Sequence, residues 1–82
     1  MAAPRNTTIY SKPGCPFCSR ITELYKLKGW PYKEYVLDRN FTREQFYNEF
    51  GHGSTFPQLI VDGTNRGGCN ETISYFKSQQ LL

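Results

Sequence analysis

An α/β fold, with one four-stranded mixed sheet flanked by three helices, is predicted by three features of this 82-residue chain. Short β-branched and aromatic segments alternate with helical segments, turn residues separate them, and the length suits one small domain. We therefore expect a single domain over residues 1–82 in the order strand, helix, strand, helix, strand, strand, helix. The first two strands should be parallel, and a closing hairpin should add an antiparallel pair.

The first three elements follow from local signals in the N-terminal half. Residues 7–10 are β-branched and aromatic, which favours a strand. A turn rich in Ser, Pro and Gly comes next, and a helix is predicted over residues 16–28 because proline is favoured at the first helical position. Gly29 ends this helix. Residues 32–37 then form the second expected strand.

The C-terminal half contains four further elements. Thr42 and Gln45 match a capping box, which marks the start of a helix. Asp62-Gly63 is a strong hairpin signal between two strands. The expected elements are a helix from Thr42 to about Phe50, a strand over 58–61, a short strand around 65–66 and a helix from residue 70 or 71 to 79.

Composition excludes several classes of function. The net charge of +3 comes from ten Lys/Arg and seven Asp/Glu that are scattered along the chain, whereas nucleic-acid binding needs a clustered basic stripe. No apolar run approaches the roughly 20 residues of a membrane span, and residues 1–6 contain no apolar segment of the secretory type. We expect a cytoplasmic protein without nucleic-acid or membrane partners. Three cysteines fit a reducing compartment, with one functional pair and one spare thiol.

Cys15-Pro16-Phe17-Cys18 is the most informative segment of the chain. Residues three apart on a helix lie on one side with Cβ atoms about 5–6 Å apart, which is close to disulfide range. Cys15 falls at the helix N-cap, where unpaired N–H groups, the helix dipole and the charge of Lys12 lower the thiol pKa. We predict that Cys15 is the nucleophile. Cys18, one turn inside, should be more buried and should resolve the mixed disulfide.

Two alternatives for this pair are a zinc half-site and two inert buried cysteines. A zinc site would take its other ligands from Cys69 and His52, which lie far downstream and show no paired spacing. A proline-containing Cys-x-x-Cys after a strand and turn favours redox chemistry instead, so no metal ligands are predicted. His52 is expected to be a surface loop residue, and Trp30 to pack near the end of the first long helix.

Three separated segments resemble the motifs of one family. Lys12-Pro13-Gly14-Cys15-Pro16-Phe17-Cys18 resembles Lys-x-x-Cys-Pro-Tyr-Cys, Thr55-Phe56-Pro57 resembles Thr-Val-Pro, and Gly67-Gly68-Cys69-Asn70-Glu71 resembles Gly-Gly-x-Asp-Asp/Glu. In this order and spacing they are similar to the dithiol glutaredoxins, over roughly residues 7–80. The resemblance implies a thioredoxin-like fold, a cis bond before Pro57, and glutathione as co-substrate with no tightly bound cofactor.

The resemblance also implies how glutathione binds. Lys12 would meet the glycine carboxylate, and the backbone of Phe56 would pair with the cysteine like an added strand. Gly68 and Cys69 would offer N–H groups to the γ-glutamyl carboxylate. Asn70 and Glu71 would lie near its amino group. The full set of implied glutathione-binding residues is Lys12, Phe17, Thr55, Phe56, Pro57, Gly68, Cys69, Asn70 and Glu71.

Three departures from the family pattern predict weaker glutathione binding. Phe17 stands where Tyr is commoner, which removes a hydroxyl. Asn70 stands where Asp is usual, which removes one anionic partner for the γ-glutamyl amine. Gly53 and Ser54 precede Thr55, where many relatives carry a basic residue.

By resemblance, the chain is expected to be a monomeric glutathione-dependent thiol–disulfide oxidoreductase. Its substrates would be protein disulfides and protein–glutathione mixed disulfides, and ribonucleotide reductase is a common partner in the family. Two alternatives stay open. One is a redoxin reduced by a flavin thioredoxin reductase, against which Lys12 and Gly67-Gly68 argue. The other is a glutathione-ligated iron–sulfur carrier, against which the proline between the cysteines argues.

Overall fold

A four-stranded mixed sheet forms the centre of the computed structural model, which describes residues 3–82. The first two residues of the N-terminal segment, in which no secretory signal was expected, lie outside the described part. The strands are β1 (Thr7–Ser11), β2 (Lys33–Val36), β3 (Gln58–Val61) and β4 (Thr64–Gly67), in the order β2-β1-β3-β4. The β1–β2 pair is parallel and the β1–β3 and β3–β4 pairs are antiparallel, which confirms the predicted sheet.

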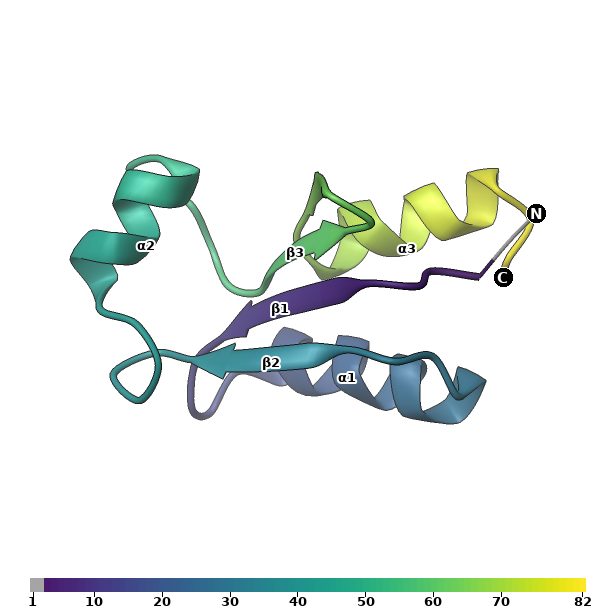
Figure 1. Ribbon diagram of the computed structural model, residues 1–82, viewed down its shortest axis with the longest axis horizontal. Coiled ribbons are helices and arrows are strands. Elements are labelled where there is room, and N and C mark those ends of the chain that lie inside the picture. Colours follow the sequence, from purple (N-terminus) through teal and green to yellow (C-terminus); the bar gives the residue numbers. More distant parts are fainter. Residues whose placement is uncertain (1–2) are drawn as a thin grey trace.

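Three helices complete the fold: α1 (Pro16–Lys28), α2 (Arg43–Phe50) and α3 (Cys69–Ser78). In Figure 1, α1 and α3 run alongside the strands and α2 lies beyond one end of the sheet. The bounds of α1 and β3 agree with the prediction. The bounds of four elements were wrong by one or two residues: β1 extends to Ser11, β2 is shorter than predicted, β4 is longer, and α3 is shifted toward the N-terminus. The pairing of Leu59 with Gly67 explains the longer β4.

The main core lies between the sheet and the helices α1 and α3. Ile9 and Leu59, which pair across β1 and β3, are fully buried against Ile21, Tyr25 and Phe76 from the two helices. Apolar residues three or four positions apart therefore line the inner faces of α1 and α3, as expected for amphipathic helices.

Two aromatic residues close the main core near the end of α1. Trp30 packs edge-on against Tyr25 and Phe76, at centroid separations of 5.5 and 5.0 Å, as predicted for its position after the helix. The hydroxyl of Tyr25 is buried and forms a 2.9 Å hydrogen bond with the hydroxyl of Thr7. This bond satisfies two polar groups that would otherwise be buried without partners.

A second group of apolar residues, the aromatic cluster, packs around Phe46 of α2. It consists of Leu37, Phe41 and Phe46 with the partly buried Tyr10, Tyr35, Tyr47, Phe50 and Phe56. Successive residues of a strand point to opposite faces of a sheet, so Tyr10 contacts this cluster while Ile9 faces the main core. Helices α1 and α3 therefore pack on one face of the sheet, while α2, beyond one end of the strands, meets the side chains of the other face only through the aromatic cluster.

The predicted capping box holds the start of α2. The backbone N–H of Thr42 donates to the side chain of Gln45 at 2.8 Å, and the N–H of Gln45 donates to the Thr42 hydroxyl at 3.1 Å. Among residues 3–82, no helix is long and apolar enough to cross a bilayer.

Candidate active site

Cys15 and Cys18 form a disulfide at the start of α1, with their Cα atoms 5.2 Å apart. Cys15 is the N-cap residue, and the backbone N–H of Cys18 lies 3.2 Å from its sulfur. This N–H is one of the donors that a helix start leaves without an intrahelical acceptor. In the disulfide form the two residues are buried almost equally, at 6% and 4% exposure, so the expected difference in burial is small.

The turn between β1 and α1 places Cys15 at the helix start. Gly14 adopts a φ of +70°, a left-handed conformation that glycine takes without the steric cost of a side chain. Pro16 then occupies the first helical position, where its missing N–H removes no hydrogen bond. The sequence Gly-Cys-Pro thus fixes both the direction of the chain and the position of the cysteine.

The segment before β3 lies beside this disulfide. The Phe56–Pro57 bond is cis, as the resemblance implied. The carbonyl oxygen of Phe56 lies 3.9 Å from the sulfur of Cys15. Within residues 3–82, the N–H and C=O of Phe56 form no backbone–backbone hydrogen bond, so both can pair with an extended ligand.

The side chain of Phe56 points away from the disulfide and into the aromatic cluster. Its ring stacks on that of Phe46 with centroids 4.1 Å apart and planes 13° apart. The ammonium of Lys12 lies over the Phe56 ring, 5.5 Å from its centroid. Phe56 therefore contacts the aromatic cluster and Lys12 through its ring, while its carbonyl group lies beside the disulfide.

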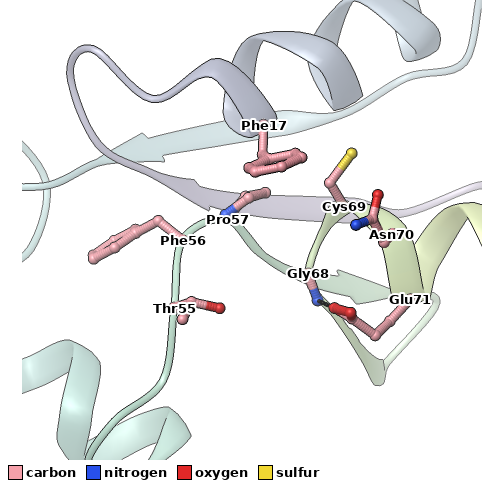
Figure 2. A pocket seen from close by; sticks show the side chains of 8 residues that line it. All are labelled: Phe17, Thr55, Phe56, Pro57, Gly68, Cys69, Asn70 and Glu71. Carbon is pink, nitrogen blue, oxygen red and sulfur yellow. Dashed lines mark hydrogen bonds between the residues drawn. The ribbon is translucent and has the colours of Figure 1, made fainter.

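A pocket of about 320 Å³ opens between the start of α1, the Phe56–Pro57 segment and the start of α3. Figure 2 shows Phe17 on one side of it, and Cys69 and Asn70 on the other. Eight of the nine predicted glutathione-binding residues line the pocket: Phe17, Thr55, Phe56, Pro57, Gly68, Cys69, Asn70 and Glu71. Lys12 does not line it but contacts the lining residue Phe56.

The start of α3 differs from the expectation at Gly68. Its N–H donates to the Oε1 atom of Glu71 at 2.9 Å, and Figure 2 shows this carboxylate turned back toward it. The Gly68 N–H is therefore already hydrogen-bonded, although it was expected to donate to glutathione. The carboxylate of Glu71, which was expected to lie near the ligand's amino group, caps the start of α3. The N–H groups of Cys69 and Asn70, in the first turn of α3, have no intrahelical acceptor.

Cys69 is a free thiol in the wall of the pocket. Only 3% of this residue is exposed, because its side chain packs into the main core. Burial raises the pKa of the Cys69 thiol, while the charge of Arg20 lowers it and that of Glu71 raises it. At neutral pH the thiol is thus kept protonated and poorly nucleophilic.

The zinc alternative finds no support in the described residues. Between residues 3 and 82, no three His, Cys, Asp or Glu side chains gather in a way that would hold a metal ion. His52 is exposed, as predicted, and its ring stacks on Tyr47 with centroids 5.6 Å apart.

One residue beside the pocket was missed by the sequence analysis. The guanidinium of Arg20 lies over the ring of Phe17, 5.6 Å from its centroid. The spacing of three residues within a predicted helix would have placed the two side chains on one face.

Comparisons with known proteins agree with this geometry. The Glutaredoxin family model matches residues 7–65. Glutaredoxin 3 of Escherichia coli K12 is 36% identical over 67 residues, which cover 80% of each chain. Glutaredoxin 1 of Francisella tularensis superposes with a TM-score of 0.76 at 25% identity, covering 93% of this chain and 95% of that one. The buckwheat glutaredoxin, solved as a complex with glutathione, shares the fold with a TM-score of 0.76 at 24% identity, over 92% of this chain and 71% of that one. The chain belongs to the glutaredoxin family.

Proposed function

We propose that this glutaredoxin is a glutathione-dependent oxidoreductase that reduces protein–glutathione mixed disulfides and protein disulfides. The observation that carries the proposal is the Cys15–Cys18 disulfide at the start of α1, beside the pocket that Phe17, Phe56 and the start of α3 line. Cys15 has a backbone donor at its sulfur and a free peptide edge, that of Phe56, next to it. These features suit a thiolate that reacts with a disulfide in an extended peptide.

The monothiol route uses Cys15 alone. Its thiolate attacks the glutathionyl sulfur of the mixed disulfide, a Cys15–glutathione bond forms, and the protein sulfur leaves with the electron pair and takes up a proton. The thiolate of a second glutathione then attacks the glutathionyl sulfur. Oxidised glutathione leaves, and Cys15 is released as a thiolate.

The dithiol route also uses Cys18. After Cys15 has attacked a protein disulfide, the Cys18 thiolate attacks the sulfur of Cys15, expels the protein thiol and forms the disulfide seen in the structure. The thiolate of one glutathione attacks the sulfur of Cys15, forms a Cys15–glutathione mixed disulfide and releases Cys18 as a thiol; the thiolate of a second glutathione attacks the glutathionyl sulfur, so that oxidised glutathione leaves and Cys15 is released as a thiolate. The two cysteines lie one helical turn apart, so this exchange needs no large movement of the backbone.

The proposal is tested by turnover of a glutathionylated peptide with glutathione, glutathione reductase and NADPH. Cys15→Ser should abolish turnover, whereas Cys18→Ser should retain it and lose only the reduction of protein disulfides. A Cys18→Ser protein as inactive as Cys15→Ser on the glutathionylated peptide would contradict the monothiol route.

Two measurements on the wild-type protein distinguish the proposed function from the redoxin and from the iron–sulfur carrier. Faster turnover with thioredoxin reductase than with glutathione would favour the redoxin. A visible charge-transfer spectrum on a dimeric protein, after anaerobic reconstitution with iron and sulfide, would favour the iron–sulfur carrier.

We propose a monomer in the cytoplasm, since the polar, mildly basic composition and the reducing chemistry fit that setting.

A further inference from the structure

A second cavity, of about 290 Å³, opens between α2 and the ends of β1 and β2, where α2 extends beyond the sheet (Figure 1). Four members of the aromatic cluster line this cluster cavity: Tyr10, Tyr35, Phe41 and Phe46. The ring planes of Tyr35 and Phe41 stand at 74° and 66° to that of Tyr10, so the rings enclose the cavity from different directions. Its volume is at the lower end of the range for ligand pockets, which suits a single side chain.

Glu49 gives the cluster cavity a negative charge. Of residues 3–82, it is the one charged residue that lines the cavity, and it forms no ion pair with another described residue. Burial raises the pKa of Tyr10 above its usual value, and the charge of Glu49 raises it further, which agrees with a carboxylate beside this ring. Since the faces of aromatic rings are also negative, rings and carboxylate together attract an organic cation.

Two amide side chains favour a cation that belongs to a peptide. The side-chain oxygens of Asn40 and Gln45, which also line the cavity, accept from the backbone N–H groups of Val36 and Thr42 at 2.9 and 2.8 Å. Within the described part of the chain their NH₂ groups form no hydrogen bond, so both remain able to donate. A peptide carbonyl accepts such bonds, whereas a free ammonium ion has no acceptor to offer.

One stack of rings separates the cluster cavity from the reactive disulfide. Phe41 and Phe46 line the cavity and lie nearly parallel to Phe56, at centroid separations of 6.2 and 4.1 Å. The carbonyl oxygen of Phe56 lies 3.9 Å from the sulfur of Cys15. An extended chain advances about 3.3 Å per residue, so a protein that reacts at Cys15 can place a residue a short way along its chain in the cavity.

We propose that the cluster cavity binds an arginine side chain of the protein substrate. The guanidinium lies over the rings and donates to Glu49, and neighbouring peptide carbonyls accept from Asn40 and Gln45. Arginine fits better than lysine because its planar guanidinium stacks on aromatic faces and can donate two bonds to one carboxylate. The inference rests on the proposed function, since it assumes a protein docked at Cys15. It adds a substrate class, segments with an arginine a few residues from the reacting cysteine.

Binding is tested on the oxidised protein, where no reaction takes place. Nα-acetyl-arginine amide and Nα-acetyl-citrulline amide, which has nearly the same shape without the charge, are titrated while backbone N–H signals are followed by NMR. The arginine compound should shift the signals of Tyr10, Tyr35 and Glu49 to saturation, and the citrulline compound should bind about fivefold more weakly. Glu49→Gln should reduce arginine binding to the citrulline level. Glu44→Gln is the matched control, because it removes the same charge from an exposed residue of α2 outside the cavity.

Use of the cavity by a substrate is tested in the coupled turnover assay. Glutathionylated peptides carry arginine or citrulline about two to six residues from the cysteine, which covers the span of the ring stack for an extended chain. At one or more of these spacings arginine should lower the KM about fivefold with kcat unchanged. Glu49→Gln should remove the difference between the two peptides, and Glu44→Gln should keep it. Circular dichroism checks that each variant is folded.

The outcomes distinguish this inference from the proposed function. If citrulline binds as tightly as arginine, or Glu49→Gln has no more effect than Glu44→Gln, the inference is refuted and the proposed function stands. Equally tight binding of tetramethylammonium would mean a site for a free amine, which also refutes it. If arginine lowers the KM at no spacing, docking of the substrate is refuted although turnover continues. If the wild-type protein turns over none of the peptides while the arginine compound still binds, the proposed function fails and the cation site remains.

Discussion

Replacing Phe56 by Val should destabilise the protein because the ring holds the active-site loop against the aromatic cluster. The ring stacks on Phe46 at 4.1 Å and lies parallel to Phe41 at 6.2 Å. Each aromatic pair contributes about 0.5–1.5 kcal/mol beyond burial, and the contact with Lys12 about 0.5–1 kcal/mol. Since neighbouring contributions do not add fully, we expect a loss of about 2 kcal/mol.

Thermal unfolding measures this loss. For a domain of this size, 1 kcal/mol shifts Tm by about 4–8 °C, so Phe56→Val should lower Tm by about 8–16 °C. Leu27→Ala is the control, because Leu27 is 83% exposed and surface changes usually stay within about 0.5 kcal/mol. In a double-mutant cycle, Phe56→Val and Phe46→Leu should couple by at least about 0.5 kcal/mol. A Tm within 2–3 °C of the wild-type value (roughly 0.5 kcal/mol), or additive effects in the cycle, would refute the reasoning.

Three other changes test separate parts of the structure. Thr42→Ala removes the N-cap of α2 and should cost about 1 kcal/mol in urea unfolding. Burial raises the pKa of Tyr25 to about 12, and the hydrogen bond from Thr7 only partly opposes this. The unfolded chain then loses this proton first, so stability should fall as pH rises from about 10 to about 12, and Tyr25→Phe should flatten that fall. A Cβ at Gly68 would meet Oε1 of Glu71 at 2.8 Å, so Gly68→Ala should displace that carboxylate and raise the KM for glutathione in the coupled assay, and an unchanged KM would contradict this.

Elements with local signals at both ends were predicted well from the sequence. Helix α1 begins at Pro16 and ends before Gly29, whose φ of +71° suits glycine, and both residues act through their own backbones. The start of α3 was placed too late because its cap, the carboxylate of Glu71, bonds back to Gly68. The sequence shows Glu71 three residues after Gly68, but a glycine lacks the side chain that makes a capping box recognisable.

The residues of the candidate site also fall into two groups, those that local spacing predicts and those whose place depends on tertiary packing. Motif residues that act through sequence-local geometry, such as Cys15 and Cys18, were located from their spacing alone. The burial of Cys69 depends on how the start of α3 packs into the main core, which no local pattern encodes, whereas the place of Arg20 beside Phe17 follows from their spacing of three residues on α1. The stacking of the Phe56 ring on Phe46 could not be predicted either, because Phe46 lies in another element and contacts Phe56 only in the folded chain.

Phe56 has two structural roles, one through its backbone and one through its side chain. Its carbonyl lies against the reactive sulfur of Cys15, while its ring is part of the packing that holds α2. A substitution chosen to improve packing would shift the peptide that substrates must meet, and one chosen for substrate fit would loosen α2. We therefore expect that successful changes at residue 56 will require compensating changes at Phe46 or Phe41, so that the three positions change as a group during evolution or design.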